Sequence, residues 1–245
     1  MNRNFVSNSN LVLRKVLNSK DNLDIIQDFI ETFLHIKIKE ITLNPYLKSK
    51  EKYLPSEEKF GIADVRVKLI NSKEMNIGIQ WIDGYYIQNK MLLYYAQIHS
   101  NQLEHNANRE NAKTVTINLL DFEYFKSADY HQIKYIDSNP DENGNKERLE
   151  FHILELPKFN KNIIATINKE DAWMIYLRGE RKDLVDYVTK KYDKINKLDK
   201  LLKEYWENEK MDWVNIAFTS PNISHLCLKT YRNINFFVLF KIILT

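Results

Sequence analysis

Two polar side chains stand inside largely apolar, β-branched runs near the middle of the chain, and they are the residues best suited to chemistry. Asp64 lies within the run 61–67, and Gln80 lies near the end of the run 75–81. A carboxylate buried in a strand is costly unless a cation or a metal ion pairs with it. Asp64 is therefore the first candidate for a charged functional site.

A simpler interpretation of Asp64 needs only its neighbours in the chain. Side chains alternate between the two faces of a strand, so Asp64, Arg66 and Lys68 share one face, opposite Val65 and Val67. On this interpretation Asp64 is a solvated edge-strand residue that pairs with Arg66 or Lys68. The residues alone leave both interpretations open.

The short polar segment 71–74 joins the two runs, so together they predict a β-hairpin. Gly78 sits inside the second strand, two residues before Gln80, and a glycine there often marks a bulge or the close approach of another group. Adjacent strands lie about 4.8 Å apart, so the hairpin should place Asp64 within about 6 Å of the 78–80 backbone.

The rest of the chain supplies elements that could position this hairpin. Apolar residues at helical spacing predict a helix near 21–34, capped by Ser19 or Asp21, and a second helix over 85–103. A charged loop is expected over 45–59, and a highly charged helical pattern over 169–211. Strands are predicted over 38–43, 115–120, 132–136 and 149–156. The core face of the 85–103 helix is assigned to Ile87, Met91, Leu92, Tyr95 and Ile98.

This order of elements predicts an α/β fold in which helices flank a mixed sheet. We divide the chain into a domain over 1–168, a helical extension over 169–211 and a tail over 212–245. The tail mixes Asn, Phe, Ile and Lys without a clean period, so an eroded extension and an ordinary final strand are equally compatible with it.

Composition bounds the class of protein. Hydrophobic residues make up 44% of the 245 residues and aromatic residues 12%, which favours a globular chain over a disordered one. The single cysteine, Cys227, excludes an internal disulfide framework, and the six histidines lack a zinc-binding spacing. The net charge of +3 is too small to indicate nucleic-acid binding by itself. Without a secretory leader or a run of ~20 apolar residues, a cytoplasmic protein that does not contact a membrane is predicted.

Five segments, in this order, resemble the PD-(D/E)XK nuclease family transposases, also called the Rpn family of recombination-promoting nucleases. The resemblance covers residues 10–210. Its segments are FGIADV at 60–65, NIGIQ at 76–80, LLYY at 92–95, TINLLDF at 116–122 and FHILELPKF at 151–159.

The resemblance implies a restriction-endonuclease-like fold and DNA cleavage that depends on Mg²⁺ or Mn²⁺. Phosphodiester hydrolysis of this kind needs a divalent cation held by hard oxygen ligands. By the resemblance, Asp64 matches the first carboxylate ligand, Ile79 offers a backbone carbonyl to the metal ion, and Gln80 matches the group that orients the water. Gly78 stands where a second carboxylate is expected, which implies a weakly bound cation.

Three other carboxylates are candidates to replace the missing one. Glu74 would share the strand face of Gly78 but would lie about 13 Å away, at ~3.3 Å per residue. Asp83 lies beyond the end of the strand, and Glu31 could reach the site only through tertiary packing.

DNA is the partner that the resemblance implies, and Lys90 and Gln88 on the 85–103 helix would face it. A solvated helix face explains both residues equally well. The charged helices over 169–211 are either solvated faces or a surface for self-association. We expect a DNA endonuclease-like protein with an altered site, or alternatively a catalytically silent DNA-binding or protein-interaction module that keeps the fold.

Overall fold

The computed structural model describes residues 13–44, 61–82, 86–105, 113–137, 148–160 and 166–219. The predicted charged loop over 45–59, Asp83 and residues 220–245 lie outside the described residues.

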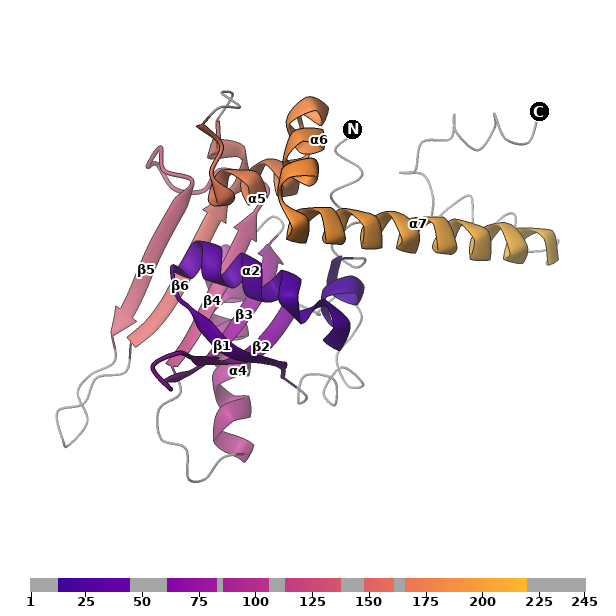
Figure 1. The fold of residues 1–245 in the computed structure, drawn as a ribbon. Helices are drawn as coiled ribbons and strands as arrows, with labels where there is room; N and C mark the ends of the chain where they lie inside the picture. The colour runs from indigo at the N-terminus through magenta and orange to yellow at the C-terminus, as the bar shows by residue number, and fades with distance from the viewer. Residues whose placement is uncertain are drawn as a thin grey trace.

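Six strands form one mixed sheet in the order β1-β2-β3-β4-β6-β5 (Figure 1). The first three strands are antiparallel neighbours, β4 and β6 continue the sheet in parallel with β3, and β5 closes one edge antiparallel to β6. This sheet and its flanking helices confirm the predicted restriction-endonuclease-like α/β fold. The strands are β1 (Ile38–Leu43), β2 (Gly61–Leu69), β3 (Glu74–Ile82), β4 (Lys113–Leu120), β5 (His131–Asp137) and β6 (Arg148–Glu155).

The predicted hairpin is the β2–β3 pair. Its turn is closed by a hydrogen bond from the Leu69 amide to the Lys73 carbonyl, with Ser72 in the left-handed region at φ 65°. The buried and half-buried residues of β2 alternate from Asp64 to Lys68, as the period-two pattern predicts. β2 lies between β1 and β3, so Asp64 is not on an edge strand, and the edge-strand interpretation is wrong.

Helices cover both faces of the sheet, because each face of the central strands is apolar. The predicted helix near 21–34 is α2 (Leu23–Leu34), which begins after the short 3-10 helix η1 (Lys20–Asn22) and ends at His35 with φ 52°. Together with α5 (Lys169–Arg178), α6 (Lys182–Lys191) and α7 (Asp193–Thr219), α2 packs over one face (Figure 1). A second, smaller apolar cluster joins α4 (Ile87–His105) to the opposite face of β3, β4 and β6.

Local sequence explains where the last three helices begin and end. Asn168 and Asp171 form a reciprocal capping box at the start of α5, and Gly179 ends the helix in the left-handed region at φ 63°. The extended backbone of Tyr192 separates α6 from α7. The helical pattern predicted over 169–211 is thus three helices, and the last continues to Thr219.

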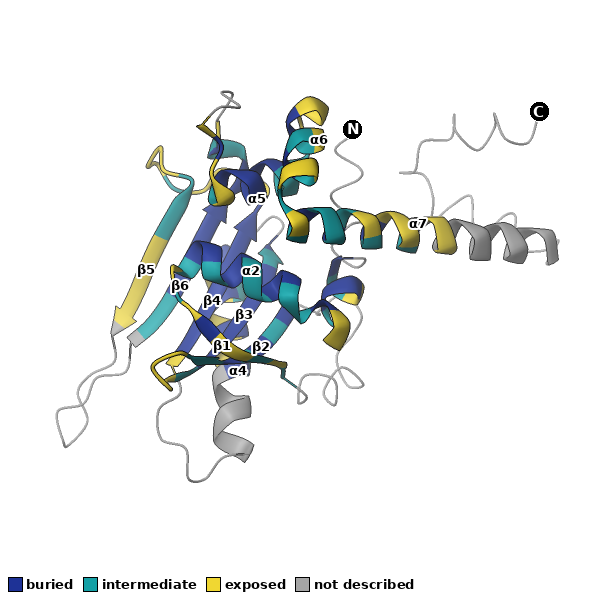
Figure 2. Cartoon of the chain, in the orientation of Figure 1, coloured by how far each residue is buried: buried dark blue, intermediate teal, exposed yellow. Residues whose placement is uncertain are grey.

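The core face of α4 differs from the prediction at one position. Leu92 is 51% exposed, whereas Tyr94 is 1% exposed and points into the protein. Leu93 is also exposed, so the inward face of α4 is formed by Ile87, Met91, Tyr94, Tyr95 and Ile98. Figure 2 shows the contrast between the buried central strands and the exposed edge strand β5.

Candidate functional site

The hairpin brings the two predicted site strands into register at Asp64. Asp64 on β2 stands directly opposite Gly78 on β3, and the next paired positions are Ala63 with Ile79 and Gly61 with Gln80. The register shifts between Gly61 and Ala63, so one extra residue of β2 bulges next to the site. The proximity of Asp64 to the 78–80 backbone therefore follows the prediction.

The Asp64 carboxylate is bound by a tyrosine that comes from the helix above it. The Tyr94 hydroxyl donates a hydrogen bond to Asp64 Oδ1 at 2.6 Å. The same hydroxyl oxygen lies 3.2 Å from the carbonyl oxygen of Ile79 and 3.4 Å from that of Ala63. Three oxygen atoms from two strands thus surround one hydroxyl group.

Two glycines make room for the tyrosine ring. A Cβ at Gly61 would lie 2.7 Å from Tyr94 Oη and 3.0 Å from Cε2. A Cβ at Gly78 would lie 2.8 Å from Tyr94 Oη and from Cε1, and 2.1 Å from Ile98 Cδ1. Any other residue at 78 would force Tyr94 and Ile98 to move. The glycine therefore permits the close approach of these two side chains to the β3 backbone.

Burial and one nearby cation set the charge of the site. Burial raises the pKa of Asp64 to about 7, against the opposing effects of the Tyr94 hydrogen bond and the positive charge of Arg14. Burial and the Asp64 charge raise the pKa of Tyr94 well above its ordinary value, so this phenol stays protonated and acts as a donor. Arg14 lies on the short helical segment 13–17, which Asn18 ties to the Ile62 carbonyl of β2 at 2.7 Å.

The Gln80 side chain makes its contact toward β4, the neighbour of β3 that lies away from β2. It is 1% exposed, and its amide donates to Asn118 Oδ1 on β4. Asn118 in turn donates to Thr116 Oγ1 at 3.1 Å and to the His152 carbonyl at 3.0 Å. Because β3 separates β4 from β2, this bond directs the Gln80 amide away from Asp64. The carbonyl of Ile79, in contrast, faces the Asp64 site, while its side chain is buried in the core.

The two predicted DNA contacts both lie in the first turns of α4. Gln88 is exposed and Lys90 is half-buried. Lys90 is four residues before Tyr94 and therefore lies on the same side of the helix, whereas Gln88 is six residues before it and does not. This spacing places Lys90, but not Gln88, on the side of the helix that carries Tyr94.

Sequence reasoning missed the roles of Tyr94, Arg14 and Gly61. One signal was present for Tyr94, because a tyrosine at an inward helix position needs a partner for its hydroxyl. The glycine at 78 gave the complementary signal of space on the facing strand. Nothing in the sequence linked Arg14 to a residue 50 positions further along.

No other carboxylate among the described residues completes a cation site here. Glu31 accepts hydrogen bonds from the Ile38 amide and from Gln27 at the end of α2, and Glu74 pairs with Arg66. Within the described ranges, no three His, Cys, Asp or Glu side chains gather closely enough to hold a metal ion. One carboxylate, already bonded to a hydroxyl donor and beside an arginine, does not fit a divalent cation.

Two other polar clusters use their groups internally. Lys158 binds Glu155 at 2.7 Å and the carbonyls of Phe125 and Ser127, and Glu155 accepts from the Tyr124 and Phe125 amides. This buried ion pair therefore anchors the 122–129 segment to the end of β6.

The second cluster is a chain of side chains across β5 and β6. His131 Nε2 lies 2.9 Å from His152 Nδ1, and His152 Nε2 lies 2.9 Å from Glu150 Oε1, which supports the interpretation of His152 as a hydrogen-bonded core residue. Lys113 pairs with the other Glu150 oxygen.

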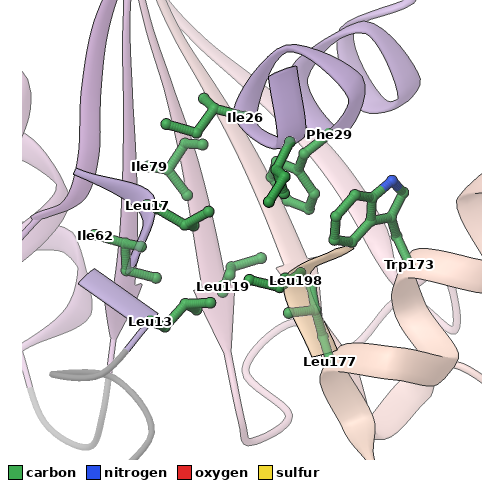
Figure 3. A pocket seen from close by; sticks show the side chains of 11 residues that line it. Leu13, Leu17, Ile26, Phe29, Ile62, Ile79, Leu119, Trp173, Leu177 and Leu198 are labelled. Atoms are coloured by element: carbon green, nitrogen blue, oxygen red, sulfur yellow. The ribbon is translucent and has the colours of Figure 1, made fainter. Parts of the chain in front are cut away.

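A small cavity near the Asp64 strands is entirely apolar. It measures about 20 Å³ and lies among the 13–17 segment, α2, the sheet, α5 and α7 (Figure 3). That space is enough for one water molecule, but the lining offers it no hydrogen-bond partner. The side chains around it are Leu13, Leu17, Ile25, Ile26, Phe29, Ile62, Ile79, Leu119, Trp173, Leu177 and Leu198.

Comparisons with known proteins bear on this arrangement at the level of the family. The model of the family described as PD-(D/E)XK nuclease family transposase matches residues 9–216. No curated protein and no solved structure matches the chain. Among the helices that the structure describes, none has the length and apolar character needed to cross a membrane.

Proposed function

Because the chain belongs to the PD-(D/E)XK nuclease family transposases, we propose that it binds DNA through this fold and that its degenerate Asp64 site leaves cleavage slow or absent. The observation that carries the proposal is the pairing of Asp64 with Gly78, which removes one of the two carboxylates the family resemblance calls for. A single carboxylate holds a divalent cation weakly, and two of the acids that could have replaced the missing one, Glu31 and Glu74, are bonded to other groups.

The position of Gln80 supports the same proposal. A group that orients the attacking water must lie within hydrogen-bond reach of it. The Gln80 amide is instead bound to Asn118, one strand further from Asp64. Of the three groups that the resemblance pairs with Asp64, the second carboxylate is therefore missing and the Gln80 amide is turned away, while the Ile79 carbonyl faces the site.

A nicking assay on supercoiled plasmid tests the cleavage part. Wild-type protein with Mg²⁺ or Mn²⁺ should nick no faster than the Asp64→Asn variant, which keeps the shape of the side chain and removes its charge. Rapid nicking by the wild type that is lost in Asp64→Asn would show that another acid completes the site, and the proposal would be wrong.

DNA binding is tested separately, through Lys90. Fluorescence anisotropy with duplex DNA should show weaker binding for Lys90→Gln and a salt dependence reduced by about one released counterion. Lys182→Gln on α6, where the lysine side chain is 87% exposed, removes the same charge and is the matched control. Equal loss in both variants would indicate a general charge effect and no specific role for Lys90.

The second candidate function is a catalytically silent module that binds a protein partner and no DNA. The observation that favours it is a set of exposed apolar residues, Tyr86 just before α4 and Leu92 and Leu93 on that helix. Wild-type protein that binds no duplex DNA at low salt would favour this candidate over the first.

We propose in addition that the C-terminal helices mediate self-association. α7 is charged and exposed along the described part of its outer face, including Lys203, Glu204 and Glu207 (Figure 2). Light scattering of the full chain and of a Lys203→Glu variant measures the oligomeric state directly. A monomer at every concentration would contradict the proposal.

A further inference from the structure

The oxygen atoms that the family resemblance assigns to a cation already surround a hydroxyl group in this chain. Tyr94 Oη lies 2.6 Å from Asp64 Oδ1 and 3.2 Å from the Ile79 carbonyl oxygen. Divalent cations need such oxygens at about 2.0–2.6 Å. A cation bound to both oxygens would have to take the space that Tyr94 Oη fills.

The charge of the cation also has a counterpart. Arg14 and Asp64 interact electrostatically, each favouring the charged form of the other, and Arg14 acts on Tyr94 in the same way. Arg14 is half-buried, on a segment held to β2 by the Asn18–Ile62 hydrogen bond. A positive charge is therefore built into the site by the fold.

We propose that the Tyr94 hydroxyl and the Arg14 guanidinium together substitute for the divalent cation at Asp64. The hydroxyl fills the space between the two ligand oxygens, and the guanidinium supplies the positive charge. This inference rests on the proposed degenerate site and deepens it, because it names what has replaced the ion.

The glycine at 78 is part of the same substitution. Its missing side chain provides the space in which the Tyr94 ring and Ile98 lie, since a Cβ there would be 2.8 Å and 2.1 Å from them. Gly61 opens the other side of the ring. A side chain at 78 and the observed positions of the Tyr94 ring and Ile98 therefore exclude one another.

The experiment is a titration of the full-length chain with Mn²⁺, in which free Mn²⁺ is measured by electron paramagnetic resonance. Wild type and Asp64→Asn should give the same curve. Tyr94→Ala should bind Mn²⁺ at least tenfold more tightly than wild type, and adding Asp64→Asn should abolish the gain. Tyr94→Phe, which removes only the hydroxyl, should bind Mn²⁺ more tightly than wild type but less tightly than Tyr94→Ala, because the ring remains.

Two controls separate the proposal from general effects of the substitutions. Tyr95→Ala removes the neighbouring buried tyrosine, which packs against Phe151, and should leave Mn²⁺ binding unchanged. In the Tyr94→Ala background, Arg14→Gln should tighten Mn²⁺ binding further, whereas Lys15→Gln should not. Asp64-dependent Mn²⁺ binding by the wild type, or none by folded Tyr94→Ala, would overturn the proposal.

A second measurement decides the matter if Tyr94→Ala does not fold. Tyr94→Phe and Asp64→Asn are conservative, and a double-mutant cycle in urea unfolding reports whether the two groups interact. The proposal requires non-additive effects, and additive effects would overturn it. DNA binding by the same proteins tests the proposed function independently. If the wild type binds no DNA, the proposed function is wrong, and the Mn²⁺ results still stand.

Discussion

The ring of Tyr94 and the backbone of Gly78 are in contact across the α4–β3 interface, with no space for a side chain between them. A Cβ at 78 would lie 2.8 Å from the Tyr94 hydroxyl oxygen, and the tyrosine in turn binds the aspartate that faces this glycine. Substitution at either position therefore acts on Asp64 as well as on local packing.

Restoring an acid at 78 without making room for it should fail. Gly78→Glu should lower the melting temperature by several degrees, because overpacking costs about 1–3 kcal/mol and each kcal/mol shifts a chain of this size by ~2–4 °C. It should also give no plasmid nicking. Adding Tyr94→Ala and Ile98→Ala should recover part of the loss, as measured by calorimetry. A Gly78→Glu protein as stable as the wild type would contradict the packing described here.

Asp64 should reduce stability at neutral pH. The folded-state pKa of about 7 lies above the ordinary value of 3.8, so the folded protein binds this proton more tightly than the unfolded chain does. Stability should therefore fall as pH rises from about 4 to about 7. Asp64→Asn has no such proton, so its advantage in melting temperature over the wild type should grow across this window. An advantage that is the same at pH 4.5 and pH 8 would show that the carboxylate ionises normally.

His131 should give the opposite dependence on pH. Burial, then His152 and then His35, lower the pKa of His131 from 6.5 to about 4, so the unfolded chain takes up the proton first. Stability should therefore fall as pH drops from about 6.5 to about 4. His131→Gln should lose less stability over this window in urea unfolding. The pKa of the neighbouring Glu150 is lowered to about 2, chiefly by the hydrogen bond from His152. Glu150 should therefore add to the loss of stability only as the pH falls below about 4.5.

Breaking the buried Glu155–Lys158 pair should be among the most damaging changes in the described core. Glu155→Ala leaves the Lys158 ammonium and the amides of Tyr124 and Phe125 without their carboxylate partner. A loss of about 3–5 kcal/mol is expected. Hydrogen exchange should report faster exchange at these two amides. In Glu155→Gln/Lys158→Met, which removes both charges, much of the stability should return; equal losses in both variants would contradict an ion-pair effect.

Local pattern was sufficient to predict the elements of the fold. Period-two alternation located the β2–β3 hairpin, and apolar spacing located α2 and α4, because these signals depend only on residues a few positions apart. The placement of Asp64 opposite Gly78 followed from the same hairpin. At this level the sequence determined the sheet register that forms the site.

Tertiary packing decided what surrounds Asp64. Tyr94 comes from 30 residues away, and it turned inward where Leu92 had been expected, because the glycines of two strands left space for a ring. Arg14 comes from a segment that is bonded to the start of β2, at Ile62. No local pattern links either residue to Asp64, since burial, hydrogen bonding and charge at Asp64 arise only when β2, β3, α4 and the 13–17 segment meet in space.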